Sequence, residues 1–85
     1  MFIQLDRSNP TPLYQQIRHQ LHQLIVSGAL PAGSRLPPER KLSAVLHVNR
    51  TTILAAYRAL KAEGYVTSHV GQGTVVTLPV EIPPE

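Results

Sequence analysis

The sequence predicts a small, mainly α-helical domain that ends in a two-stranded antiparallel β hairpin. Three stretches carry apolar residues at helical spacing, and prolines, glycines and an asparagine separate them. After Gly64 the pattern changes to two β-rich runs around a glycine-containing turn, which is typical of a hairpin. The 85 residues have room for one small domain. We therefore expect three helices followed by one hairpin.

The first helix is expected over residues 12–27, after a polar lead-in of residues 1–9. Thr11 can cap this helix, with Pro12 at the first helical position, where a missing N–H does no harm. Gly28 should end it. The apolar stripe of the helix consists of Ile17, Leu21, Leu24 and Ile25.

The second and third helices are expected close together. Pro38 should open a short helix over residues 38–46, after an extended piece at residues 34–36. Asn49 is the candidate N-cap of the third helix, which begins at Arg50 and ends before Gly64. A connection of three to four residues between two helices is typical of a helix-turn-helix.

The hairpin is expected from the runs at residues 65–70 and 74–78, with residues 71–73 at its tip. A short third strand is expected near residues 35–36. We expect the folded domain to span residues 1–78. Residues 79–85 contain three prolines and are interpreted as the start of a linker to a C-terminal domain that lies outside this sequence. The core should contain Ile17, Leu21, Leu24, Leu36, Leu42, Leu46, Ile53, Tyr57, Leu60 and Val66.

Charge is concentrated in the middle of the chain. The net charge is only +3, but six cations lie between residues 35 and 61 beside a single acid, Glu39. This favours an anionic partner, although a solvated helix surface explains the charges equally well. No signal segment, membrane-length apolar run or cysteine is found, so we expect a cytoplasmic protein with no membrane partner.

The polar cluster at the start of the third helix indicates nucleic-acid binding. In a helix-turn-helix the second helix of the pair enters the major groove and uses its N-terminal residues on base edges. Arg50 can hold a phosphate or a guanine edge in two places, while Thr51 and Thr52 are small enough to approach the groove. The alternative is that Asn49 and the threonines only cap the helix.

The hairpin that follows directly makes the arrangement that of a winged helix. Gly71 and Gly73 allow the backbone to approach a duplex closely, and His69 and Gln72 can donate to phosphates or a groove edge. We expect the tip to lie along the minor groove, which is only about 6 Å wide. Alternatively, the glycines serve only the turn.

The stretch LPPERKLSAVLHVNRTTILAAYRALKAEGYVTSHVGQGTVV resembles the DNA-binding domain of the GntR family of bacterial transcription regulators. The upstream PLYQQIRHQLHQLIVSGALPAGSRLP is similar to the first helix of that family, so the resemblance covers residues 10–78. It implies a double-stranded DNA operator as partner. It also implies that Arg35 contacts a phosphate and that Leu54 replaces an arginine found in many members. The DNA-reading residues it implies are Arg40, Asn49, Arg50, Thr51, Thr52 and Gly71 with its neighbours.

Two subfamilies share such a head. PLYQQI and AAYRALKAEGY are similar to the MocR type, whose C-terminal part resembles a pyridoxal-phosphate-dependent aminotransferase of fold type I. The smaller YtrA type is the alternative. The resemblance implies no cofactor in this chain, since pyridoxal phosphate would belong to the missing C-terminal domain. Homodimerisation is expected through that domain, and the isolated head should be monomeric.

Two other classes of function are alternatives to DNA binding. An enzyme is not expected, because no serine, histidine and aspartate order is evident and acids are scarce near the basic segment. His19 and His22 have a spacing that could hold zinc, but no third ligand is evident and a solvated surface is favoured. A protein-interaction module is the second rival, and salt dependence of binding would distinguish it from a DNA-binding domain.

Overall fold

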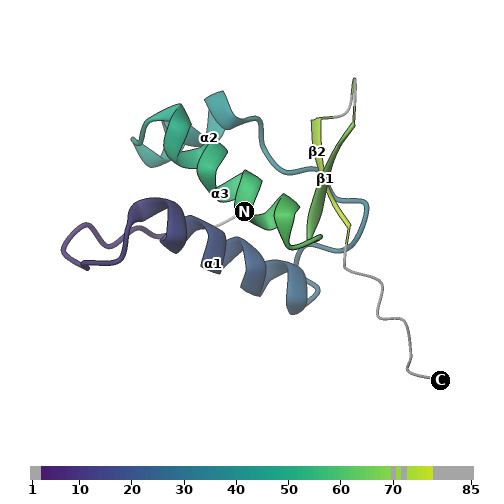
Figure 1. Ribbon diagram of the computed structural model, residues 1–85, viewed down its shortest axis with the longest axis horizontal. Helices are drawn as coiled ribbons and strands as arrows, with labels where there is room; N and C mark the ends of the chain where they lie inside the picture. Colours follow the sequence, from purple (N-terminus) through teal and green to yellow (C-terminus); the bar gives the residue numbers. More distant parts are fainter. Residues whose placement is uncertain (1–2, 70, 72, 78–85) are drawn as a thin grey trace.

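The computed structural model describes residues 3–69, 71 and 73–77. In these residues three helices precede a two-stranded antiparallel hairpin (Figure 1). The helices are α1 (Leu13–Val26), α2 (Glu39–Leu46) and α3 (Arg50–Ala62), and the strands are β1 (Val66–His69) and β2 (Gly73–Val76). The fold class predicted from the sequence is confirmed. Residues 79–85, interpreted above as a linker, lie outside the described residues, as do Val70 and Gln72.

The hairpin is tied to the segment that leads into α2. In the hairpin Val66 pairs with Val76, and His69 pairs with Gly73. Arg35 forms an isolated antiparallel bridge with Val75, beside a hydrogen bond from the Leu36 N–H to the Thr74 carbonyl of 2.8 Å. The predicted third strand is therefore a single bridge. It fixes the hairpin next to the basic segment that starts at Arg35.

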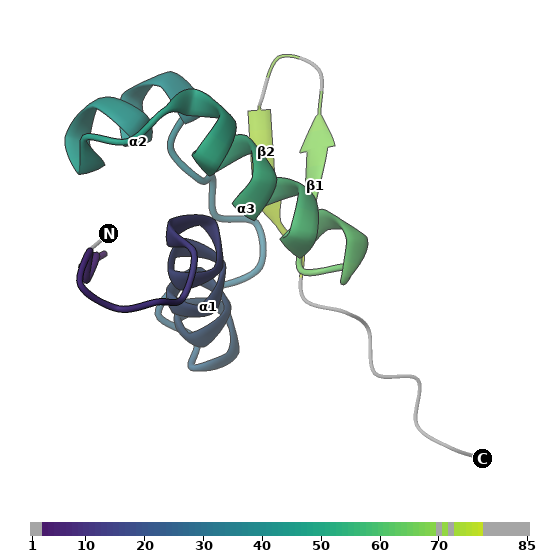
Figure 2. The same ribbon diagram turned by 60° about the vertical axis from the view of Figure 1, so that its left-hand side comes forward.

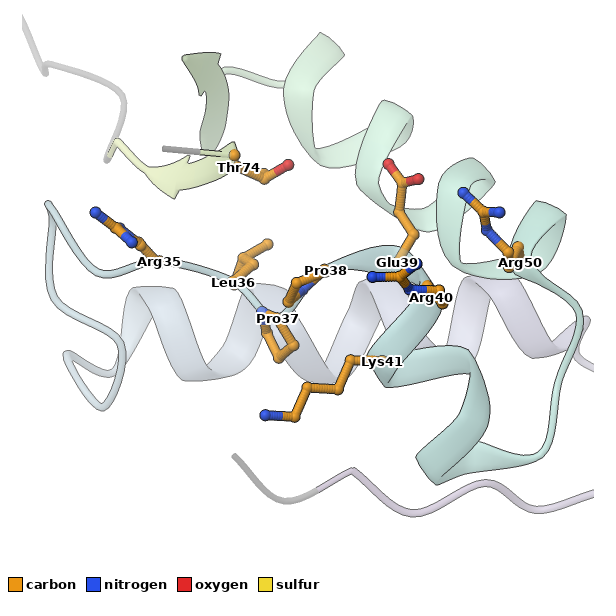
Figure 3. A pocket seen from close by; sticks show the side chains of 10 residues that line it. Arg35, Leu36, Pro37, Pro38, Glu39, Arg40, Lys41, Arg50 and Thr74 are labelled. Carbon is orange, nitrogen blue, oxygen red and sulfur yellow. The ribbon is translucent and has the colours of Figure 1, made fainter. Parts of the chain in front are cut away.

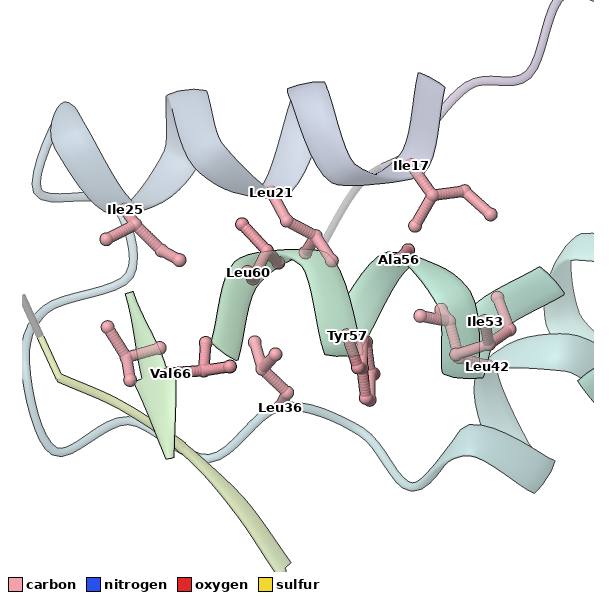
Figure 4. Packing of buried hydrophobic residues seen from close by; sticks show 11 residues of the cluster. Ile17, Leu21, Ile25, Leu36, Leu42, Ile53, Ala56, Tyr57, Leu60 and Val66 are labelled. Atoms are coloured by element: carbon pink, nitrogen blue, oxygen red, sulfur yellow. The ribbon is translucent and has the colours of Figure 1, made fainter. Parts of the chain in front are cut away.

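Helix α3 crosses the middle of the molecule, with α1 on one side and the hairpin and the segment before α2 on the other (Figure 4). Ile53 and Leu60 of α3 are 0% exposed, which confirms the predicted face of this helix. Eight of the ten predicted core residues are buried. Leu24 and Leu46 are the exceptions, because they are only half-buried at the edge of the core. Ile25 takes the inner position instead, four residues after Leu21 and on the same line of α1.

Both proline-opened helices begin one residue later than predicted. Pro12 and Pro38 have ψ of 146°, which is extended backbone, so each occupies the N-cap position outside its helix. The predicted cap by Thr11 is wrong, since Pro12 occupies the N-cap position and no described side chain makes a capping hydrogen bond there. Instead the Thr11 N–H donates to Asn9 Oδ1 at 2.9 Å, and this local turn sets the entry to the helix.

Candidate nucleic-acid interface

Helices α2 and α3 are joined by the short turn of a helix-turn-helix. His47 follows α2 in the left-handed region, with φ of 56°. The backbone N–H groups of His47 and Val48 both donate to the Ser43 carbonyl, which closes the end of the helix. The chain then reverses direction, and α3 begins three residues later, at Arg50.

The start of α3 is open. Asn49 occupies the predicted N-cap position with extended backbone, but its side chain makes no capping hydrogen bond. Asn49, Arg50 and Thr51 are exposed, while Thr52 is half-buried. The first N–H groups of a helix have no partner within it and carry the positive end of the helix dipole. The polar cluster therefore surrounds an end of α3 that suits an anion.

A basic hollow of about 670 Å³ lies between the segment before α2, the first turn of α2, the start of α3 and the start of β2. Its charged lining residues are Arg35, Arg40, Lys41, Arg50 and Glu39. Figure 3 shows Arg35 and Arg50 at its two ends, with Glu39 and Arg40 between them. Leu36, Pro37, Pro38, Gly73 and Thr74 complete the lining. Four cations from three elements thus line one concave surface.

None of the four cations of the basic hollow forms an ion pair with another described residue. The ion pair of the described part joins Arg18 on α1 to Glu63 after α3, with a distance of 3.0 Å between nitrogen and oxygen. Glu39 lines the basic hollow without reaching any of the cations to within ion-pair distance. Like charges held together without partners repel one another, so this arrangement suits a surface that binds an anion.

Tyr57 of α3 forms a hydrogen bond with Pro37, one of the residues that line the basic hollow. Its hydroxyl donates to the Pro37 carbonyl at 2.6 Å, and its side chain is 4% exposed. Burial, and secondarily the negative charge of Glu39, raises the pKa of Tyr57 well above its usual range. The hydroxyl therefore stays protonated and holds the segment that carries Arg35 and Arg40 against α3.

The hairpin tip offers backbone and small side chains. His69 and Gly71 are exposed, and Gln72 lies outside the described residues. Gly71 and Gly73 have φ of 82° and 77°, so the turn itself requires glycine at both positions. A Cβ at either position would meet no atom within 4 Å, which leaves the surface above the tip open. The requirement of the turn and an open approach to a ligand are compatible here.

The structure gathers only some of the predicted site residues in one place. Arg35, Arg40, Arg50 and Gly73 line the basic hollow. The start of α3 lines two further hollows: Asn49 and Thr52 share one with Arg7, and Thr51 and Thr52 share the other with Pro12 and Tyr14. His69 and Gly71 lie on the hairpin and line none of these hollows.

Sequence reasoning missed two contributors to this surface. Lys41 was counted in the basic segment but was not assigned to the site, although it lines the basic hollow. Its side chain extends away from Glu39 and Arg50 (Figure 3). Arg7 lies in the lead-in, where neither spacing nor charge clustering singled it out.

Of the two histidines on α1, His19 is exposed and His22 has an aromatic partner. The His22 ring packs edge-on against Tyr65 with ring centroids 4.6 Å apart. Among the described residues no group of three or more histidine, cysteine, aspartate or glutamate side chains could hold a metal ion. Within the same part of the chain, no helix has both the length and the hydropathy needed to cross a membrane.

Three helices, with the second and third forming a helix-turn-helix and a hairpin following directly, define a winged helix-turn-helix protein. The sequence pattern of the bacterial regulatory proteins of the gntR family matches residues 13–76. The chain belongs to the GntR family of bacterial regulatory proteins.

Two curated relatives show which members this chain is similar to. It is 45% identical over 76 residues to the probable rhizopine catabolism regulatory protein MocR of Rhizobium meliloti, covering 88% of this chain and 15% of that protein. It is 35% identical over 75 residues to the transcriptional repressor YtrA of Bacillus subtilis, covering 88% of this chain and 58% of that protein. The chain thus spans about a seventh and somewhat over half of the lengths of these two relatives.

Two solved structures have the same fold. YtrA from Sulfolobus acidocaldarius, a GntR-family transcription factor, has a TM-score of 0.87 and 36% identity, covering 94% of this chain and 84% of that one. AraR(DBD) in complex with operator ORE1 has a TM-score of 0.74 and 27% identity, covering 91% and 94%. This chain is therefore a GntR-family winged helix-turn-helix domain of the kind that binds DNA in transcription regulators.

Proposed function

We propose that this chain is the DNA-binding head of a bacterial transcription regulator, in which α3 enters the major groove and the hairpin lies along the minor groove. The observation that carries the proposal is the basic hollow, which Arg35, Arg40, Lys41 and Arg50 line without ion pairs among the described residues. The operator complex of AraR(DBD), which shares this fold, supports it.

The groove assignment rests on the size and polarity of the exposed residues. The start of α3 carries Asn49, Arg50 and Thr51, all exposed and able to reach base edges, and the Asn49 side chain makes no capping hydrogen bond to the N-terminal amides. At the hairpin tip Gly71 and Gly73 carry no side chains and have open space above them. A narrow groove admits such a tip, whereas the wide groove admits a helix.

Salt dependence tests this function against a protein-interaction module. Fluorescence anisotropy would measure the Kd for a duplex that the domain selects from a random pool, and for a scrambled duplex, at several salt concentrations. A domain that neutralises several phosphates should lose affinity steeply as salt rises, with a slope of about −0.9 per phosphate contact on a log–log plot. An affinity that does not change with salt would contradict the proposal.

A matched pair of charge variants sharpens the test. Arg40→Ala and Arg18→Ala each remove one positive charge, but only Arg40 lines the basic hollow. Arg40→Ala should weaken binding by about tenfold or more, while Arg18→Ala should leave it nearly unchanged. Equal losses in the two variants would mean that net charge, and not this surface, drives binding.

We further propose that this head belongs to a regulator of the MocR type, supported by its 45% identity to MocR over 76 residues. Pyridoxal phosphate would then be held by a C-terminal domain, and this chain would take no part in enzyme catalysis. The YtrA type is the alternative. The absorbance spectrum of the purified full-length protein tests for the cofactor, and a spectrum without its band would favour the YtrA type.

Dimerisation through that second domain would place two heads on two half-sites about one helical turn apart, or a multiple of it. Two linked heads bind more tightly than one, because the second binds at a high effective concentration. The isolated chain should sediment as a monomer in analytical ultracentrifugation, and a tight dimer would contradict this assignment. The cytoplasm, where the chromosome lies, is the proposed location.

A further inference from the structure

The N-terminal arm (residues 3–9) is docked along α1 and is not the loose lead-in that its polar sequence suggests (Figures 1 and 2). Two glutamines, one turn apart on α1, each bond both backbone groups of one arm residue. Gln20 accepts from the Gln4 N–H at 2.9 Å and donates to the Gln4 carbonyl. Gln16 bonds Asp6 in the same two-sided way, at 2.8 and 3.0 Å. These side-chain amides pair with the backbone N–H and carbonyl groups of the arm, as the backbone of a neighbouring strand would in a sheet.

Apolar contacts add to this docking. Ile3 and Leu5 alternate with the two bonded residues and pack, half-buried, against the core. Gln16 also donates to the Thr11 carbonyl at 2.9 Å, which fixes the chain between the arm and α1. Hydrogen bonds to Gln16 therefore hold the chain both before Arg7, at Asp6, and after it, at Thr11. These contacts fix the position of Arg7.

Arg7 reaches across to the turn of the helix-turn-helix. Its Nη2 donates to the carbonyls of Leu46 and His47, at 3.1 and 2.9 Å. Carbonyls at the end of a helix have no partner within it, and a cation there also complements the negative end of the helix dipole. His47 is the left-handed residue of the turn, and only Val48 and Asn49 separate it from α3.

The same guanidinium lies next to the residues that open α3. Arg7 lines one hollow together with Asn49 and Thr52. A shift of the turn would therefore move Asn49 and Arg50 relative to the rest of the basic hollow. The segment before α2, on the other side of the hollow, is held by a different contact, the hydrogen bond from Tyr57 to Pro37. The two sides of the interface have different anchors, and Arg7 is the anchor on the side of the turn.

We propose that the N-terminal arm is a positioning element of the DNA interface, and that Arg7 is the positioning residue through which it sets the start of α3. This inference rests on the proposed DNA binding. A positioning residue acts through the turn, so its loss changes where the DNA-reading side chains lie but not how many phosphates the domain contacts.

The experiment compares Arg7→Ala, Arg7→Lys and Gln16→Ala with the unaltered 85-residue chain. Gln16→Ala loosens the arm without changing charge, and Arg18→Ala is the charge-matched control, because Arg18 pairs with Glu63 away from the turn. Anisotropy with the selected and the scrambled duplex is measured over a range of salt concentrations. In parallel, NMR follows the backbone amides of residues 47–52 in the DNA-free proteins.

Arg7→Ala should weaken binding to the selected duplex by about five- to tenfold, with less effect on the scrambled one, because two charge-assisted hydrogen bonds are lost at an exposed site. Gln16→Ala should act in the same direction, and Arg7→Lys should restore part of the loss. The salt slope should stay unchanged, and the amides of residues 47–52 should shift in Arg7→Ala but not in Arg18→Ala.

Three results would overturn the inference. A salt slope reduced by about one in Arg7→Ala would mean that Arg7 contacts a phosphate itself. Unchanged affinity of Arg7→Ala for both duplexes would mean that the arm has no role in binding, and unshifted amides in the turn would remove the proposed route. Failure of the unaltered chain to bind either duplex would instead refute the proposed function.

Discussion

Replacing Tyr57 by phenylalanine removes one oxygen from the junction between α3 and the segment that carries Arg35 and Arg40. The lost contact is the 2.6 Å hydrogen bond to the Pro37 carbonyl, made by a side chain that is 4% exposed. A buried hydrogen bond contributes about 0.5–1.5 kcal/mol, and an acceptor left unpaired costs about 1–3 kcal/mol. Pro37 is half-buried, so water can partly replace the hydroxyl. We expect the free energy of unfolding to fall by about 1–2 kcal/mol.

Urea unfolding followed by circular dichroism measures this loss, and the melting temperature should fall by roughly 5–15 °C for a domain of this size. Tyr65→Phe is the matched control, because the Tyr65 hydroxyl makes no hydrogen bond to a described residue. A Tyr57→Phe domain as stable as Tyr65→Phe would refute the reasoning. The DNA affinity of Tyr57→Phe should also fall, since the segment with Arg35 and Arg40 loses its fixed position.

The pH dependence gives a second readout on the same residue. Burial raises the pKa of Tyr57 in the folded chain, whereas an exposed tyrosine in the unfolded chain ionises near pH 10. Stability that depends on the neutral hydroxyl is therefore fully present below about pH 10 and is lost as the pH rises further. The difference in stability between the unaltered chain and Tyr57→Phe should shrink above about pH 10. A difference that stays constant across that range would contradict the assignment.

Three further substitutions test other parts of the interface. Arg50→Ala should reduce the binding free energy for the selected duplex by about 1–3 kcal/mol and relax specificity at one base pair of the DNA site. Equal losses of affinity for the selected and scrambled duplexes would mean that Arg50 contacts a phosphate and not a base. Gly71→Val places a branched side chain at φ of 82°, where no atom lies within 4 Å, so the strain is in the backbone. If circular dichroism shows that this variant is folded, anisotropy should still show weaker DNA binding. A folded variant with undiminished affinity would refute the placement of the hairpin tip in the minor groove. His47→Gly relieves the left-handed strain at φ of 56° and should raise the unfolding free energy by about 0.5–1 kcal/mol in urea titrations, while a loss of stability would mean that the His47 side chain stabilises the turn.

Much of the fold follows from local sequence signals. The stripe that contains Ile17 and Leu21 predicted α1, because a helix face must repeat every three to four residues, and Pro12 and Gly28 placed its ends to within one residue. Ile53, Tyr57 and Leu60 set the buried face of α3 for the same reason. The glycines around position 72 marked the hairpin turn, since few other residues adopt positive φ there.

Other features depended on which partner the folded chain brought near. Thr11 and Asn49 have the residue types of helix caps, yet neither side chain caps its helix. Local propensity only offers such a bond, and competing contacts decide whether it forms. Leu24 is as apolar as Ile25, but only Ile25 is fully buried, while Leu24 packs at the edge of the core, because tertiary packing decides which side of an apolar stripe lies innermost.

The candidate site divides in the same way. Charge and helix periodicity are local features of the sequence, so the sequence alone predicts that Arg35, Arg40 and Arg50 lie in a basic segment around a helix-turn-helix. Their meeting in one hollow with the start of β2 depends on how the folded chain packs, and so does the contact of Arg7 with the turn about 40 positions later. Contacts between residues about 40 positions apart form only when whole elements of the fold pack together, and no local sequence pattern predicts them.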